Sequence, residues 1–196
     1  PFIGTGGHGH TFPGAVVPHG MIQPSPDTRI DGWDACSGYY YADSTINGFS
    51  HTHVSGTGCC DYGDVLLMPT VGKQQYRTTD PQSQRLAYAS SFSHKNEIAE
   101  PGYYSVFLDT YQVKAEISST KRGAIHRYTF PENTESGFII DLDYSLQRQT
   151  NSEMEIEVIS DTEICGHKKT TYWAFDQYIN FYAKFSKPFS YTLVTD

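Results

Sequence analysis

The chain beyond Asp64 alternates apolar and polar residues with a period of two. Residues 153–158, with the sequence EMEIEV, place acidic and apolar side chains on opposite faces, which is the pattern of a strand with one solvated face. The same alternation recurs in residues 111–117, 126–130 and 178–185, and shorter apolar runs occupy residues 65–68, 86–92, 103–108, 138–142 and 191–194. Each segment is predicted to be a strand, and none after Asp64 shows the period of a helix.

Turn residues separate the predicted strands. Pro101-Gly102, Arg122-Gly123 and residues 131–133 combine proline, glycine and asparagine, which favour tight turns. About ten short strands joined by turns predict an all-β fold, an antiparallel sandwich or barrel larger than an immunoglobulin domain. Because no repeat or linker divides the chain, we expect a single domain over residues 1–196, with the sandwich strands in residues 65–196.

Residues 1–64 have a different character. The first 60 residues hold eleven of the seventeen glycines, five of the eight histidines and three of the four cysteines, but no Lys and no Glu. Disorder usually combines low hydrophobicity with high charge, and this segment carries little charge. We therefore expect residues 1–64 to form long ordered loops.

Composition narrows the classes of function. Aromatic residues make up 14% of the chain and charged residues 18%, which suits strands and the binding of sugar faces on aromatic rings. The net charge of -8 argues against a nucleic-acid partner, which needs a basic face. No apolar run approaches the roughly 18 residues of a membrane span. The sequence begins at Pro1 rather than Met, so we expect that a leader preceded it.

The cysteines and histidines leave two hypotheses open. Cys36 is a candidate to bridge Cys59 or Cys60, although four cysteines are too few for a disulfide scaffold and no C-x-x-C zinc motif occurs. Histidines gather in the loop segment and are candidate ligands for zinc or iron: His8, His10, His19, His51 and His53. Because glycines flank the first pair and no H-E-x-x-H motif is present, hydrogen bonds to backbone or sugar hydroxyls are the alternative.

Carboxylates and one tryptophan carry the remaining candidate chemistry. Hydrolysis of a glycosidic bond needs two carboxyl groups, and the loop segment offers only aspartates: Asp27, Asp31, Asp34, Asp43, Asp61 and Asp64. Turn capping by Asp is the alternative. Trp33 lies among small and polar residues, where it is better placed to stack on a sugar than to fill a core. The glycine-rich residues 4–9 lack the strand, helix and Lys of a phosphate loop.

Several blocks of the chain resemble one family. They are PFIGTGGHGHTFPGA at 1–15, PHGMIQPSPDT at 18–28, GYYY at 38–41 with GFSHTHVSGTGC at 48–59, PGYYSV at 101–106 and RGAIHRYTFP at 122–131. In this order they are similar to the N-terminal domain of glycoside hydrolase family 92, whereas Cys60 departs from the family pattern. The resemblance implies a galactose-mutarotase-like β-supersandwich that works with a C-terminal (α/α)6 helical domain of the same polypeptide.

The resemblance also implies an activity for the whole protein. Family members are exo-acting, inverting, calcium-dependent α-mannosidases, so we expect a mannose-containing glycan as substrate, a periplasmic or secreted location and a role in N-glycan degradation. The helical domain supplies the catalytic acid, the catalytic base and most calcium ligands. We therefore assign no catalytic residue and no metal ligand to residues 1–196, and expect this chain to be inactive alone.

The matching blocks indicate which residues line a sugar site between the two domains. By position they are Trp33, Gly58, Cys59, His19, Gly6 and Asp61. Two hypotheses of other classes remain: a free-standing carbohydrate-binding module without hydrolase activity, and a histidine-ligated metalloenzyme.

Overall fold

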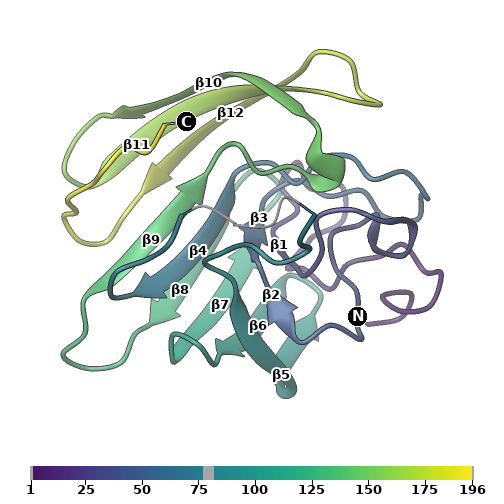
Figure 1. The fold of residues 1–196 in the computed structure, drawn as a ribbon, viewed down its shortest axis with the longest axis horizontal. Coiled ribbons are helices and arrows are strands. Elements are labelled where there is room, and N and C mark those ends of the chain that lie inside the picture. Colours follow the sequence, from purple (N-terminus) through teal and green to yellow (C-terminus); the bar gives the residue numbers. More distant parts are fainter. Residues whose placement is uncertain (1, 77–81, 196) are drawn as a thin grey trace. The chain divides into compact units, whose positions relative to one another are not determined.

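A computed structural model describes residues 2–76 and 82–195, so Pro1, which opens the first matching block, lies outside the described residues. The described residues form β-strands and two short 3-10 turns, η1 (Trp33–Ala35) and η2 (Leu146–Arg148) (Figure 1). The strands are β1 (Ser25–Asp27), β2 (Thr45–Ile46), β3 (Gly48–Ser50), β4 (Leu66–Val71), β5 (Ser90–Glu100), β6 (Tyr103–Leu108), β7 (Val113–Ser119), β8 (Ala124–Thr129), β9 (Ser136–Asp141), β10 (Thr150–Val158), β11 (Glu163–Thr171) and β12 (Gln177–Lys184). The predicted all-β class is confirmed.

The chain divides into two compact units, Pro1–Arg148 and Gln149–Asp196. The first unit holds a four-stranded sheet of order β1-β3-β4-β9 and a five-stranded sheet of order β2-β5-β6-β7-β8. The second is one three-stranded sheet of order β10-β11-β12. All strand pairs are antiparallel. The single domain over residues 1–196 stays a prediction.

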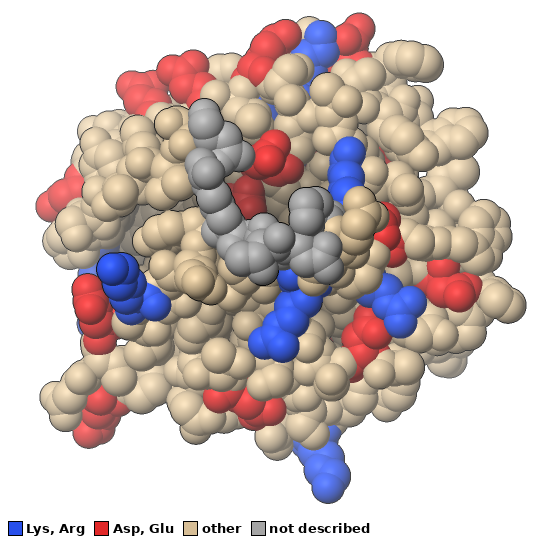
Figure 2. Space-filling view, viewed as in Figure 1, with Lys and Arg blue, Asp and Glu red and all other residues tan. Residues whose placement is uncertain are grey.

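Charged side chains of both signs are interspersed on the face drawn in Figure 2. Several basic groups are paired with carboxylates, as in Arg29 with Asp43 and Arg127 with Glu116, where the closest N–O distances are 2.9 and 2.8 Å. No helix in the described ranges has the length and apolar character needed to cross a bilayer.

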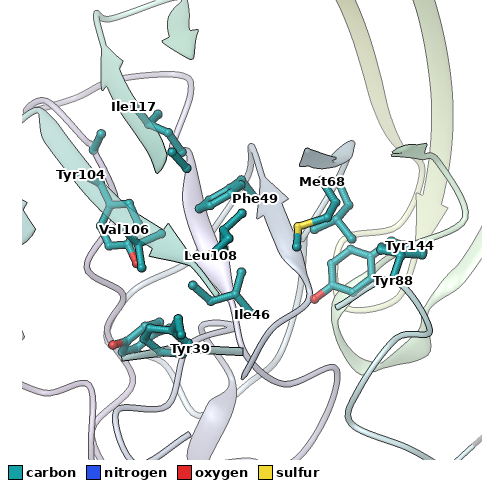
Figure 3. Close-up of a cluster of buried hydrophobic side chains, with 14 of the residues drawn as sticks. Tyr39, Ile46, Phe49, Met68, Tyr88, Tyr104, Val106, Leu108, Ile117 and Tyr144 are labelled. Atoms are coloured by element: carbon teal, nitrogen blue, oxygen red, sulfur yellow. The ribbon is translucent and has the colours of Figure 1, made fainter. Parts of the chain in front are cut away.

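The core of the first unit lies between its two sheets. On β6, Tyr104, Val106 and Leu108 are fully buried, because the two-residue period turns all three toward the same face. Phe49 of β3 and Met68 of β4 come from the other sheet and belong to the same cluster (Figure 3). Two sheets that share an apolar interior make the predicted sandwich.

Most strands predicted beyond Asp64 match observed ones, but the prediction and the structure differ in three places. Residues 191–194 are not a strand, so that prediction was wrong. Strand β11 was not predicted, because its buried positions include Lys168 and Thr170, which break the apolar alternation. The described part of residues 1–64 is mostly long loops, as expected, but it also holds the short strands β1, β2 and β3, which were not predicted. Backbone hydrogen bonds tie these loops, such as the one from the Thr28 N–H to the Gly38 carbonyl at 2.7 Å.

Candidate functional site

Trp33 is the most prominent side chain of the loop segment. It opens the η1 turn after Gly32, whose φ of 107° suits glycine, and its side chain remains 61% exposed. Gly58 lies against the six-membered part of the indole, where an added Cβ would come 2.1 Å from Cη2. The His10 ring meets the indole at 88°, with 4.8 Å between ring centroids. The indole is therefore held at its six-membered ring by Gly58 and by the His10 ring, and 61% of the residue remains exposed.

Hydrogen bonds link the loops that carry Trp33 and its neighbours. His8 Nδ1 lies 2.6 Å from Asp34 Oδ1, which links the N-terminal glycine loop to the η1 turn. The Gly56 N–H donates to the His10 carbonyl at 2.5 Å, so residues 56–58 are held beside His10. Segments far apart in the sequence, around His10 and Gly58, thus converge on Trp33.

Two cysteines hold the backbone that carries Trp33. The Cys36 thiol donates to the Trp33 carbonyl at 2.8 Å, and the Cys60 thiol donates to the Gly32 carbonyl at 3.5 Å. All four cysteines are free, so the candidate bridge from Cys36 to Cys59 or Cys60 is not formed. Burial raises the pKa of both the Cys36 and the Cys60 thiol, and the protonated thiols act as hydrogen-bond donors to the turn.

The six predicted site residues lie in different local surroundings. Trp33 and Gly58 are in contact, and Cys59 follows directly in sequence. The backbone N–H of Gly9 donates to the carbonyl of Gly6. His19 is exposed on a turn with φ of 57°, and the Asp61 carboxylate accepts from the Tyr62 N–H at 2.9 Å.

A buried Asp27–Ser50–His53 cluster has the residue types of a hydrolase triad but not its geometry. Ser50 Oγ donates to Asp27 Oδ2 at 2.5 Å, and His53 Nε2 lies 2.7 Å from Asp27 Oδ1. In a triad the serine donates to the histidine, and the aspartate holds the other ring nitrogen. The side chains of His53 and Asp27 are 0% exposed, so no substrate reaches them. The cluster joins β1, the end of β3 and the following loop.

Several of the loop carboxylates are already engaged in ion pairs. Ion pairs join Asp31 to Arg148, Asp34 to His8, and Asp43 to Arg29. Within residues 2–76 and 82–195, no three His, Cys, Asp or Glu side chains come together in a way that would hold a metal ion. The three-histidine hypothesis for zinc or iron was therefore wrong. The same residues do not fit calcium, which takes six to eight oxygen ligands.

One contact of the site was not foreseen from the sequence. His10 was considered only as a metal ligand or a hydrogen-bonding group, and its edge-to-face packing on Trp33 depends on the loop path. Its Nε2 is buried, without a hydrogen-bond partner in the part of the chain that the structure describes. The short-range spacing of His8 and His10 gave no signal for this packing.

Comparisons with known proteins agree on one family. The chain matches the glycosyl hydrolase family 92 N-terminal domain over residues 1–196. It is similar to a family GH92 α-mannosidase of Bacteroides thetaiotaomicron solved in complex with mannoimidazole, with a TM-score of 0.89 and 40% identity over 95% of this chain and 24% of that one. A GH92 inverting mannosidase of the same organism gives a TM-score of 0.65 and 29% identity over 82% of this chain and 20% of that one.

A curated relative is also described as a glycosidase. It is an uncharacterized secreted glycosidase of Arthroderma benhamiae, 32% identical over 134 residues, which are 67% of this chain and 17% of the relative. The chain thus spans a quarter or less of the length of these relatives.

Proposed function

The chain belongs to the glycosyl hydrolase family 92 N-terminal domain family, and we propose that it supplies one wall of the sugar-binding site of an exo-acting α-mannosidase. The observation that carries this proposal is the exposed Trp33 indole braced by Gly58 and His10. The proposed wall consists of Trp33, Gly58 and Cys59, with His8, His10 and Asp34 at its rim.

The wall has the chemistry that a pyranose needs. One face of a sugar ring is largely C–H and packs on an aromatic ring, while its hydroxyls need donors and acceptors around the edge. Trp33 would supply the aromatic ring, and the His8–Asp34 pair would supply hydrogen-bond donors and acceptors for the hydroxyls. The His8 and Asp34 side chains are 84% and 36% exposed. Because Gly58 and His10 fix the indole in advance, little side-chain entropy is lost when a sugar stacks on it.

The catalytic groups are proposed to come from elsewhere in the polypeptide. An inverting glycosidase holds its acid and base about 6.5–9.5 Å apart so that water fits between the base and the anomeric carbon, and Asp31, Asp34 and Asp43 of the loop segment are already paired with Arg148, His8 and Arg29. We place the acid, the base and the calcium in a C-terminal (α/α)6 helical domain, where calcium would act as a template and Lewis acid. The 196-residue chain is then inactive alone.

Location and natural substrate are part of the same proposal. A curated relative is described as a secreted glycosidase, and a structural relative was solved with mannoimidazole. These support a secreted enzyme that acts on mannose-containing glycans. A periplasmic location and N-glycans as natural substrate belong to the proposal and rest on the family resemblance of the sequence.

Activity measurements on the full-length protein test this function. We expect release of mannose from α-linked mannobiose, with the β-anomer appearing first by proton NMR, and loss of activity with a chelator that calcium reverses. Failure of the full-length protein to release mannose would refute the proposal. The 196-residue chain alone should neither hydrolyse nor bind mannosides well, and a sub-millimolar Kd in calorimetry would instead favour a free-standing carbohydrate-binding module.

A further inference from the structure

Two histidines face each other between the sheets of the first unit. His51 follows β3 of the four-stranded sheet, and His126 lies on β8 of the five-stranded sheet. Their Nε2 atoms are 3.1 Å apart, and their ring centroids are 5.0 Å apart with a 39° angle between the planes. Both residues are only partly buried. Neither belongs to the Trp33 wall.

The far side of each ring has an oxygen partner. His51 Nδ1 lies 2.6 Å from the Val65 carbonyl oxygen, and His126 Nδ1 lies 2.8 Å from the Tyr128 hydroxyl. A carbonyl oxygen only accepts, so His51 Nδ1 carries the proton. Burial lowers the pKa of both histidines, which keeps both rings neutral at pH 7. His51 therefore presents a lone pair at Nε2, and it accepts the Nε2–H of His126.

We propose that this pair is a two-imidazole site for a borderline divalent transition ion such as Zn²⁺, Ni²⁺ or Cu²⁺. Two metal–nitrogen bonds of about 2.0–2.1 Å at a near-tetrahedral angle place the nitrogens about 3.2–3.4 Å apart, close to the observed 3.1 Å. Both Nδ1 atoms already have the oxygen partners that orient metal-binding histidines. An ion here would link the two sheets.

The binding step needs only one proton to move within the site. The His126 proton leaves Nε2 and returns at Nδ1, where the Tyr128 oxygen accepts it. Both Nε2 lone pairs then bind the ion, which gives up two of its waters. Because the described residues offer no third His, Cys, Asp or Glu at this point, water keeps the remaining positions. Calcium prefers oxygen ligands and should not compete.

Histidine ring nitrogens can be observed directly in the ¹⁵N-labelled 196-residue chain. We expect one equivalent of Zn²⁺ to shift the Nε2 signals of His51 and His126, to leave those of the exposed His8 unchanged, and to give no change with Ca²⁺. Zn²⁺ shifts confined to other histidines would overturn the proposal. So would a Zn²⁺ Kd weaker than about 0.1 mM. This reading uses the unmodified chain and does not depend on any variant folding.

Variants then test the two ligands and their orientation. His126→Gln should abolish Zn²⁺ binding, and Tyr128→Phe should weaken it by about 10- to 100-fold because the Nδ1 partner is lost. His8→Ala is the matched control and should leave the Kd unchanged. An affinity of His126→Gln within twofold of the parent chain would contradict the assignment.

Discussion

Replacing Gly58 by Ala should displace the Trp33 indole without straining the backbone at residue 58. Gly58 is absent from the residues with positive φ, so Ala adopts the same backbone conformation. The added methyl would sit 2.1 Å from Cη2 of Trp33, and the ring must withdraw by about 1.3 Å to restore an ordinary 3.4 Å contact. The substitution therefore tests where the ring lies rather than whether it is present.

The expected loss is large for catalysis and small for stability. A misplacement of about 1 Å in a positioning group costs up to about 100-fold in rate, so we expect kcat/KM of the full-length protein to fall by about 10- to 100-fold. Because Trp33 is 61% exposed, the free energy of unfolding should change by no more than about 1 kcal/mol.

Two assays on the same variant separate displacement from its consequence. Trp33 and Trp173 are the two tryptophans of the 196-residue chain, so Trp33 fluorescence can be followed alone in that chain with Trp173→Phe, while kcat/KM is measured on the full-length protein. Gly123→Ala is the control, because its Cβ would meet an atom only at 3.9 Å, and its kcat/KM should not change. If Gly58→Ala shifts the emission of Trp33 while kcat/KM stays within twofold, the position of the ring is not important and the reasoning is wrong.

Two further predictions concern the buried polar groups. The Glu97 side chain is fully buried and accepts hydrogen bonds from the hydroxyls of Tyr39 and Tyr104, at 3.0 and 2.6 Å. Glu97→Ala should lower the free energy of unfolding, measured in urea, by about 3–5 kcal/mol. A decrease below about 1 kcal/mol would contradict this. Folding lowers the pKa of His51 and of His126, so the unfolded chain binds more protons than the folded chain at mildly acidic pH. The free energy of unfolding should therefore be highest above about pH 6.5 and should fall below that pH by up to about 1.4 kcal/mol per pH unit for each histidine. The free energy of unfolding should depend less steeply on pH in His126→Gln than in the parent chain. An equal pH dependence would show that folding does not lower the pKa of His126.

The alternation of apolar and polar residues predicted strands whose buried positions are apolar, but it did not predict strands whose buried positions are polar. Residues 103–108 were predicted correctly because Tyr104, Val106 and Leu108 alternate with less apolar neighbours, and all three are core residues. β11 escaped prediction because Lys168 is buried. An apolar pattern reports burial only where the buried residue is itself apolar.

The site required information that lies far apart in the chain. The contact between Gly58 and Trp33 joins residues 25 positions apart, and that between His51 and His126 joins residues 75 positions apart. The resemblance of the sequence blocks indicated the first pair by position. Nothing in the spacing of His126 indicated the second, because register between sheets is set by the whole sandwich.

The central claim is that Trp33 binds the sugar, and Trp33→Ala in the full-length protein tests it most directly. A Trp side chain of about 250 Å² that is 61% exposed leaves about 150 Å² open, and a sugar covering half of that gains about 2 kcal/mol. We predict that kcat/KM for α-linked mannobiose falls about 25-fold with little change in Tm. Trp173→Ala, at a similarly exposed position, should leave kcat/KM unchanged. A Trp33→Ala protein with kcat/KM equal to that of the parent would contradict the account.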